Sequence, residues 1–183
     1  MKTIKIIITT ALLGTLSLAT TTETYAQMSD YKFNQLFEIG FELALEGEYE
    51  KAVQIFNQLA EADKNHAQVL YLQSICKKKV GVPASYTVNS LEKAVKNVDQ
   101  FHQTGRVEDK SAPVKAWFHL GEAQADAGNY DRAIEAYRNY MSCIPLASLD
   151  HKREVIARIK DLKNQKMTDQ EVGLSSTLAR KQP

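Results

Sequence analysis

The sequence predicts an all-α protein in which short links join successive helices. Apolar residues recur three and four positions apart along most of the chain after its first segment, as on one face of an α-helix. Glycine and proline residues fall between these periodic stretches. Almost no stretch alternates apolar and polar residues as a half-buried strand would. Helices with short links pack on one another, so we expect a helical stack and no sheet.

Residues 1–26 are expected to be a cleavable export signal outside the fold. A positively charged start precedes the apolar stretch 6–19, and a threonine-rich segment then leads to Ala26. The apolar stretch is shorter than the roughly 20 residues that span a bilayer. A retained anchor and an earlier cut after Ala19 stay open as alternatives. No cysteine stands at the cleavage site for lipid attachment, so we expect an exported periplasmic or secreted protein, with outer-membrane association left open.

The charge balance argues against a polyanionic partner. The leader carries two of the 23 basic residues and one of the 22 acidic residues, which leaves a neutral mature chain. Nucleic acids and anionic membranes favour a net basic surface, so neither is expected as the main partner. Acidic residues gather between positions 33 and 66, while later segments lean basic. We interpret this asymmetry as solvated helix faces, with orientation of a partner as the alternative.

The first three helices are expected at 31–46, 49–62 and 65–80. The first two contain apolar residues at helical spacing, and Gly47 separates them. The third ends before the run Gly81-Val82-Pro83, which cannot continue a helix.

Four further helices are expected at 88–103, 113–127, 130–143 and 149–165. Glycine or proline residues delimit them in order: Gly105, Pro113, Gly128 and Pro145. The last one has an apolar face with Ile156 and Ile159 and basic residues elsewhere, as the cap of an open-ended stack requires. Beyond it, residues 167–183 show little apolar periodicity, and we expect a disordered tail.

One pattern occurs twice with the same internal spacings. The later copy comprises Trp117, Leu120, Gly121, Gly128, Tyr130, Ala133, Tyr137 and Pro145, and the earlier copy comprises Leu36, Ile39, Gly40, Leu43, Gly47, Tyr49, Ala52, Phe56 and Leu59. The later copy resembles the tetratricopeptide repeat, whose signature spans about 34 residues. It departs from that signature at Gln124, where tyrosine is usual, and at Tyr137, where phenylalanine is common.

A degenerate third copy lies between these two. Its first helix contains Leu70, Gln73, Ser74 and Gly81, its second contains Ala94, Val98 and Phe101, and a long connection covers 82–89. The resemblance implies a right-handed α-α superhelix within residues 27–166. Its parts would be three repeats at about 33–66, 67–108 and 114–147 and the capping helix 149–165.

A looser resemblance concerns the order of these features. An export signal, an acidic first repeat, a Trp/Leu-Gly repeat and a basic, isoleucine-containing helix are similar to the N-terminal repeat modules of Bacteroidetes envelope proteins, including OmpA-like ones. Those proteins usually continue into a peptidoglycan-binding domain. This chain stops before such a domain, so we expect either a free-standing relative in the cell envelope or a protein that lacks those functions.

The tetratricopeptide resemblance also implies where a partner would bind. In such arrays the first helix of each pair lines a concave groove, and its exposed side would carry Asn34, Phe37, Glu38, Phe41, Gln68, Tyr71, Ile75, Lys78, Lys79, Lys115, Phe118, His119, Glu122 and Asp126. Spread aromatic residues would anchor a peptide or helix. The alternative is that Phe37, Phe41 and Phe118 pack against neighbouring repeats. Chaperone-binding relatives hold a carboxylate with Lys, Asn and Arg residues, a set that is mostly missing here, so we expect a more apolar ligand.

No enzyme motif or cofactor site is recognisable. The chain lacks a phosphate-binding loop, paired-cysteine metal spacing and a nucleophile elbow. His119 and Glu122 could contribute two metal ligands, but without a visible third we expect no metal. Cys76 and Cys143 are read as core residues, with a disulfide as the alternative. We therefore expect a non-enzymatic protein-binding scaffold, or alternatively an adaptor subunit of an outer-membrane or peptidoglycan-associated machine, in an oligomeric state the sequence does not specify.

Overall fold

The computed structural model describes residues 28–145 and 148–179, so the expected export signal at 1–26 lies outside it. The helices are α1 (Asp30–Leu45), α2 (Tyr49–Ala62), α3 (Ala67–Lys79), α4 (Ser85–Ala94), α5 (Lys115–Asp126), α6 (Tyr130–Cys143) and α7 (Leu149–Ala179). A short 3₁₀ helix, η1 (Val95–Asn97), follows α4, and strands β1 (Val98–Asp99) and β2 (Ala112–Pro113) pair in parallel.

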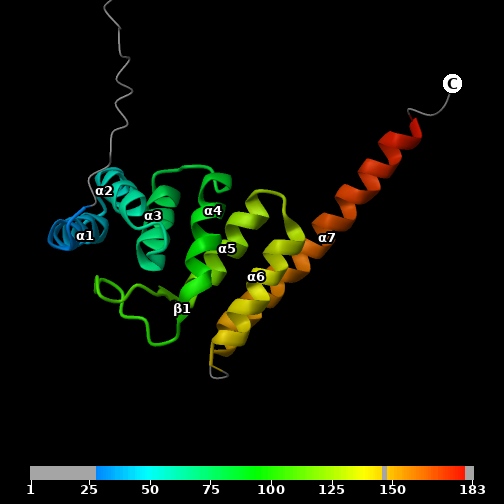
Figure 1. The fold of residues 1–183 in the computed structure, drawn as a ribbon. Coiled ribbons are helices and arrows are strands. Elements are labelled where there is room, and N and C mark those ends of the chain that lie inside the picture. The colour runs from blue at the N-terminus through cyan, green and yellow to red at the C-terminus, as the bar shows by residue number, and fades with distance from the viewer. Residues whose placement is uncertain (1–27, 146–147, 180–183) are drawn as a thin grey trace, which may run out of the picture.

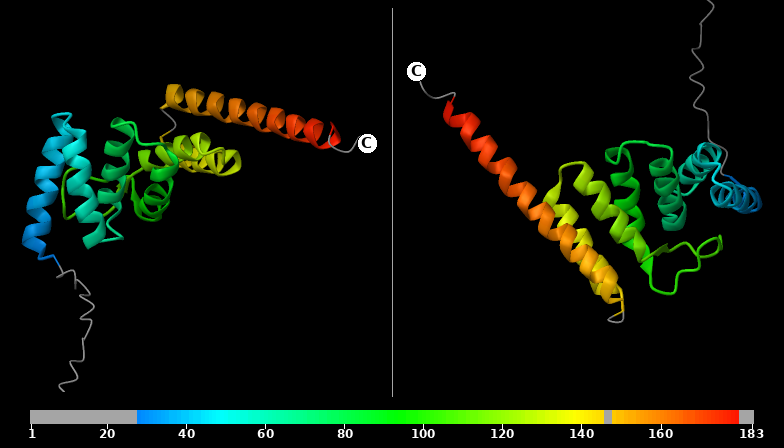
Figure 2. Two further views of the ribbon diagram at one scale, coloured as in Figure 1. Left: turned by 90° about the horizontal axis from the view of Figure 1, so that it is seen from above. Right: turned by 180° about the vertical axis from the view of Figure 1, so that it is seen from behind.

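Each helix packs against its neighbours in the chain, which produces a stack (Figure 1). The views from above and behind show the same order from α1 to α6, with α7 lying against α6 and running on past the stack (Figure 2). This arrangement confirms the predicted all-α repeat architecture. No described helix is both long and apolar enough to cross a bilayer.

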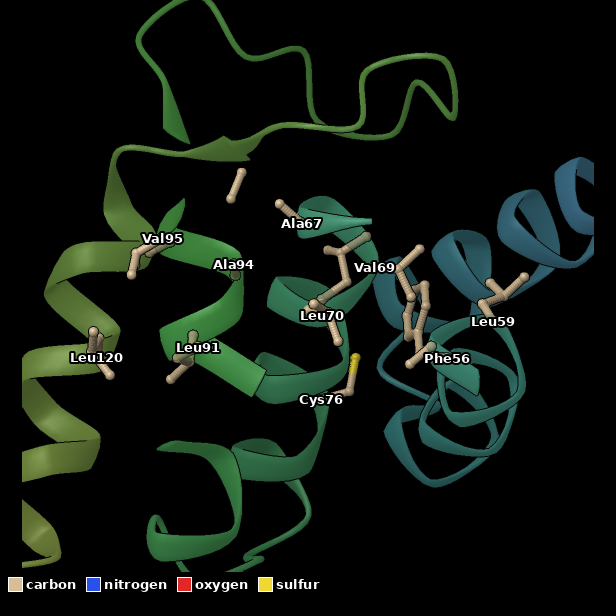
Figure 3. Packing of buried hydrophobic residues seen from close by; sticks show 14 of the residues in the cluster. Phe56, Leu59, Ala67, Val69, Leu70, Cys76, Leu91, Ala94, Val95 and Leu120 are labelled. Atoms are coloured by element: carbon tan, nitrogen blue, oxygen red, sulfur yellow. The ribbon is translucent and has the colours of Figure 1, made fainter. Parts of the chain in front are cut away.

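Within residues 28–145 and 148–179, the core consists of two apolar clusters along the stack. The larger one joins α1 to α5, and Figure 3 shows Phe56, Leu70, Leu91 and Leu120 contributed by four successive helices. The smaller one joins α6 to α7 around Val155, Ile159 and Leu162. The apolar spacing that predicted the helices therefore marks the faces that they bury against one another.

The signature glycine and alanine residues lie where paired helices approach most closely. A Cβ atom added at Gly121 would lie 2.6 Å from the ring of Tyr137, and one at Gly40 would lie 2.9 Å from Ile55. Ala52 and Ala133 are completely buried. The small residues are thus a steric requirement of helix pairing, as their positions in the repeat predicted.

Ala133→Leu should lower the free energy of unfolding by about 1–3 kcal/mol, because three extra carbon atoms have to fit a closely packed position. The same substitution at Ala52 should act alike. Urea denaturation followed by circular dichroism measures the loss, and Ala62→Leu on the exposed part of α2 is the matched control. A midpoint equal to that of the unchanged protein would contradict this placement of Ala133.

The second helix of the middle repeat is shorter than predicted. The sequence suggested a helix over 88–103, whereas α4 begins at Ser85 and ends at Ala94. Val98 lies in β1, and Phe101, expected on this helix, is 85% exposed. The backbone turns at this point because Val98 pairs with Ala112 and the Asp99 carboxylate accepts a hydrogen bond from the Phe101 amide at 2.8 Å. The link before α4, residues 80–84, is longer than the links 46–48 and 127–129 of the other two pairs, as predicted, and a second irregularity follows α4.

The last helix is longer than predicted. It was expected to end near residue 165, with a disordered tail from residue 167, but α7 continues through Ala179. Polar contacts fasten its extension to α6: the Lys166 ammonium lies 2.6 Å from the Asp131 carboxylate, and the Tyr130 hydroxyl donates to Asp169 at 2.9 Å. The residues that form these contacts are polar and do not recur at helical spacing as apolar residues do, so the sequence pattern did not indicate the contacts. Residues 180–183 lie outside the described part.

Candidate partner-binding groove

The residues predicted to line the groove fall into three groups by burial. Asn34, Glu38, Lys78, Lys79, Lys115 and Asp126 are exposed; Phe41, Tyr71, Ile75, Phe118, His119 and Glu122 are partly buried; Phe37 and Gln68 are buried. The structure therefore keeps most of the predicted face accessible and removes two positions from it.

Phe37 is a core residue and not a groove residue. Its ring lies 6.4 Å from that of Phe56 in an edge arrangement and 6.1 Å from that of His66, and its side chain is completely buried. Phe41 stacks on it with centroids 6.3 Å apart. The aromatic side chain fills the junction of α1, α2 and α3, so for this position the alternative of packing against a neighbouring repeat is correct.

Gln68 is buried by the segment between β1 and β2, residues 100–111, which we name the insertion loop. The green loop in Figures 1 and 2 runs from the end of α4 back past α3 toward α1. The Gln68 amide nitrogen donates to the carbonyls of Arg106 and Asp109 at 2.9 and 2.7 Å, and its oxygen accepts from the Gly105 amide at 2.6 Å. The sequence reasoning missed these contacts, because it assigned residues 98–103 to a helix.

Asp109 organises the insertion loop from within. Its carboxylate accepts hydrogen bonds from the backbone amides of Gln103 and Ser111 at 2.7 and 3.0 Å and also from the Ser111 hydroxyl. Burial alone would raise the pKa of Asp109, but these hydrogen bonds and the nearby His102 ring lower the pKa to about 2. The carboxylate that accepts these hydrogen bonds is therefore ionised at neutral pH.

Glu122 joins three helices on the predicted groove face. One carboxylate oxygen lies 2.7 Å from the Lys78 ammonium of α3 and 2.9 Å from the His119 ring nitrogen of α5, and the other lies 3.5 Å from the Arg158 guanidinium of α7. We call these four residues the Glu122 junction. Burial would raise the pKa of Glu122, but the hydrogen bonds and charges of His119 and Lys78 lower the pKa to about 2.

Aromatic rings contact two members of the Glu122 junction, His119 and Arg158. The Tyr71 ring lies 5.9 Å from that of His119, and burial raises the pKa of Tyr71 to about 12. Phe118 packs between Tyr140 of α6, 5.4 Å away, and the Arg158 guanidinium, 5.0 Å above its ring. Phe118 and Tyr71 are therefore both partly buried, and each packs against one of the two apolar clusters.

Two chemical alternatives can be placed in this structure. Glu122 is surrounded by cations, and the described residues contain no group of three potential ligands that could hold a metal ion. Cys76 and Cys143 are free, and burial raises the pKa of the Cys76 thiol to about 11. Cys76 is consequently a packing residue and not a reactive thiolate.

The start of α1 borders a separate cleft of about 480 Å³. Its lining includes the predicted groove residue Asn34 together with Asp63, His66 and Lys110. Lys110 of the insertion loop forms an ion pair with Asp63 at 3.2 Å, and both residues line the cleft. Asn34 therefore lies at a cleft that the insertion loop also lines.

The comparison with known proteins agrees with this geometry. Residues 114–142, which form α5 and α6, match the family model described as tetratricopeptide repeat. The chain contains a tetratricopeptide repeat. No curated protein sequence was found to match the chain.

Several solved structures share the fold over most of this chain. The Yersinia enterocolitica type III secretion chaperone SycD, in complex with a peptide of the translocator YopD, is 18% identical with a TM-score of 0.55, covering 75% of this chain and 97% of SycD. PcrH, a Pseudomonas aeruginosa protein, in complex with the chaperone-binding region of PopD is 18% identical with a TM-score of 0.55, covering 76% and 96%. The first repeat domain of Spaghetti (RPAP3), bound to the HSP90 peptide SRMEEVD, is 13% identical with a TM-score of 0.56, covering 78% and 98%. At these identities the similarity concerns the fold.

Proposed function

We propose that this protein is a non-enzymatic binding module that holds a segment of a partner protein on the face formed by α3, α5 and the start of α7. The Glu122 junction carries the proposal, because it fixes side chains from these three helices at one accessible surface. A rigid surface binds with less entropy loss than a mobile one. The structures of the same fold that hold peptides support this use of the helical stack.

The chemistry of this face favours a segment with an apolar or aromatic side chain and acidic neighbours. Tyr71 is partly exposed with its ring 5.9 Å from that of His119, and Lys79 and Lys115 of the same predicted face are exposed. Glu122 adds little negative potential, because Lys78 and Arg158 already neutralise it. Such a partner would gain affinity from the aromatic contact and faster association from the basic rim.

Photo-crosslinking from single positions tests the proposal. We expect p-benzoylphenylalanine at Lys115 or Asp126, on the groove side of α5, to give one discrete adduct in cells that make the protein. The matched controls are Gln54 and Arg138, exposed positions on α2 and α6, the second helices of their pairs. Equal adducts from both pairs of positions, or none from α5, would contradict a groove-bound partner.

We extend the proposal to the cell envelope on the basis of the export signal expected at residues 1–26. The crosslinking experiment then has a second readout, because the adduct should fractionate with the envelope. An adduct with a cell-wall enzyme or an outer-membrane subunit would favour the adaptor role. Adducts confined to the cytoplasm would contradict the location and leave groove binding intact.

A further inference from the structure

Part of the predicted groove already holds a polypeptide segment, the insertion loop. Phe41 of α1 and Gln68 of α3 were predicted to face a partner, and both contact this loop in the structure. His66 adds a contact between its Nε2 and the Val107 carbonyl at 3.2 Å. Residues 105–109 of the same chain are therefore contacted by three side chains: Phe41 of α1, His66 just before α3 and Gln68 at the start of α3.

These three side chains contact backbone atoms of the loop. Gln68 and His66 contact one amide and three carbonyls, and Phe41 contacts the backbone of Gly105, where an added Cβ would lie only 2.5 Å from the aromatic ring. Gly105 has φ +90°, a left-handed conformation that other residues rarely adopt. Contacts of this kind select a backbone shape with glycine at one position and tolerate many sequences at the others.

The loop is also held with little apolar burial. Gln103, Thr104, Arg106 and Glu108 are exposed, and the partly buried Val107 is its one side chain in the larger apolar cluster. Segments with few buried apolar contacts open locally at a lower cost in free energy than global unfolding. A loop docked mainly by hydrogen bonds is therefore suited to exchange with another segment that offers the same bonds.

We propose that Phe41, His66 and Gln68 form a binding subsite for glycine-containing polypeptide backbone, which the insertion loop fills until a partner segment displaces it. The inference rests on the proposed function, since it extends the groove from α3 and α5 to α1. It specifies the partner: a segment with a glycine that lies against Phe41 and places its amide on the Gln68 oxygen. The loop then sets a threshold of affinity that a partner has to exceed.

The loop sequence itself provides the probe. In the full chain, Gly105→Val should release the loop, because the new side chain meets Phe41, while the three subsite residues stay unchanged. A fluorescent synthetic peptide of residues 101–111 should then bind this variant saturably, as measured by fluorescence anisotropy. Binding to the unchanged protein should be at least about ten-fold weaker, because the loop competes at high effective concentration. Thr104→Val, at an exposed neighbouring position, is the matched control and should behave as the unchanged protein.

Two further arms assign the binding to the subsite. Adding Gln68→Leu to Gly105→Val should abolish binding of the peptide. A peptide that carries valine in place of its glycine should not bind the Gly105→Val protein. Hydrogen exchange reports whether the backbone amides of residues 105 and 111 lose protection in the Gly105→Val protein. A loop that stays protected, or a released loop with no peptide binding, would overturn the proposal.

If Gly105→Val fails to fold, the peptide is added to the unchanged protein instead. Excess peptide should then accelerate exchange of the loop amides, and unaltered exchange would overturn the proposal. The outcome is separable from that of the proposed function. If the peptide does not bind but the crosslinks at Lys115 and Asp126 are retained, the subsite is contradicted and groove binding stands. If the crosslinks are lost but the peptide binds, groove binding is contradicted and the subsite stands.

Discussion

Gln68→Leu should lower the free energy of unfolding by about 2–4 kcal/mol, although the two side chains have similar volumes. The substitution leaves the Gly105 amide and the Arg106 and Asp109 carbonyls without their buried partner. Each unsatisfied buried group costs about 1–3 kcal/mol. The total stays below the sum, because a loop near the surface can turn some of these groups to water. Urea denaturation followed by circular dichroism measures the loss.

Gln58→Leu on the exposed side of α2 is the control for this prediction, and its unfolding midpoint should hardly change. Hydrogen exchange adds a local readout, since the Gly105 amide should lose its protection in Gln68→Leu while the helices keep theirs. A stability loss below about 0.5 kcal/mol would mean that the insertion loop is not fastened through Gln68. Protection of the Gly105 amide in the variant would lead to the same conclusion.

The repeat pattern was readable from the sequence because its physical cause is local. Gly121 and Tyr137 belong to one helix pair, and their close approach imposes residue size at fixed spacing. The same requirement at Gly40 and Ala52 marks the first repeat. Helix bounds in these two repeats are therefore set by neighbours within the pair, and α2 and α6 begin and end where the sequence predicted.

The insertion loop and the α7 extension depend on contacts between distant residues. Gln68 bonds to atoms 37 to 41 positions away, and Lys166 reaches Asp131 across 35 positions. These contacts are polar and leave no periodic signal, so pattern reasoning assigned a helix to one segment and disorder to the other. The run of polar residues around Gly105 was the one local indication of a loop.

The groove residues show the same division. Spacing along a helix predicts which side chains of that helix share a face, because side chains three and four apart lie together. The spacing could not predict which residues of neighbouring helices each side chain contacts, since those contacts depend on how the helices cross. Phe37 meets His66 and is buried, whereas Glu122 meets Lys78 and Arg158 and becomes a junction.

Glu122→Gln should destabilise the protein at pH 7 by about 1–3 kcal/mol and have almost no effect near pH 2. The variant keeps the shape of the side chain and removes the charge that holds Lys78 and Arg158. The pKa of Glu122 falls from 4.5 to about 2 on folding. A group whose pKa is lowered on folding stabilises the native state above its unfolded pKa. That contribution should therefore disappear as the pH falls from about 4.5 to about 2.

The measurement is the difference in unfolding free energy between the unchanged protein and Glu122→Gln at a series of pH values. Asp109 titrates in the same window, but it is present in both proteins and cancels from the difference. Glu135→Gln, at an exposed position of α6, is the control and should give a small difference at every pH. A Glu122 difference that stays constant from pH 7 to pH 2 would show that the carboxylate acts by its shape alone. The junction would then hold α3, α5 and α7 together through packing and not through charge.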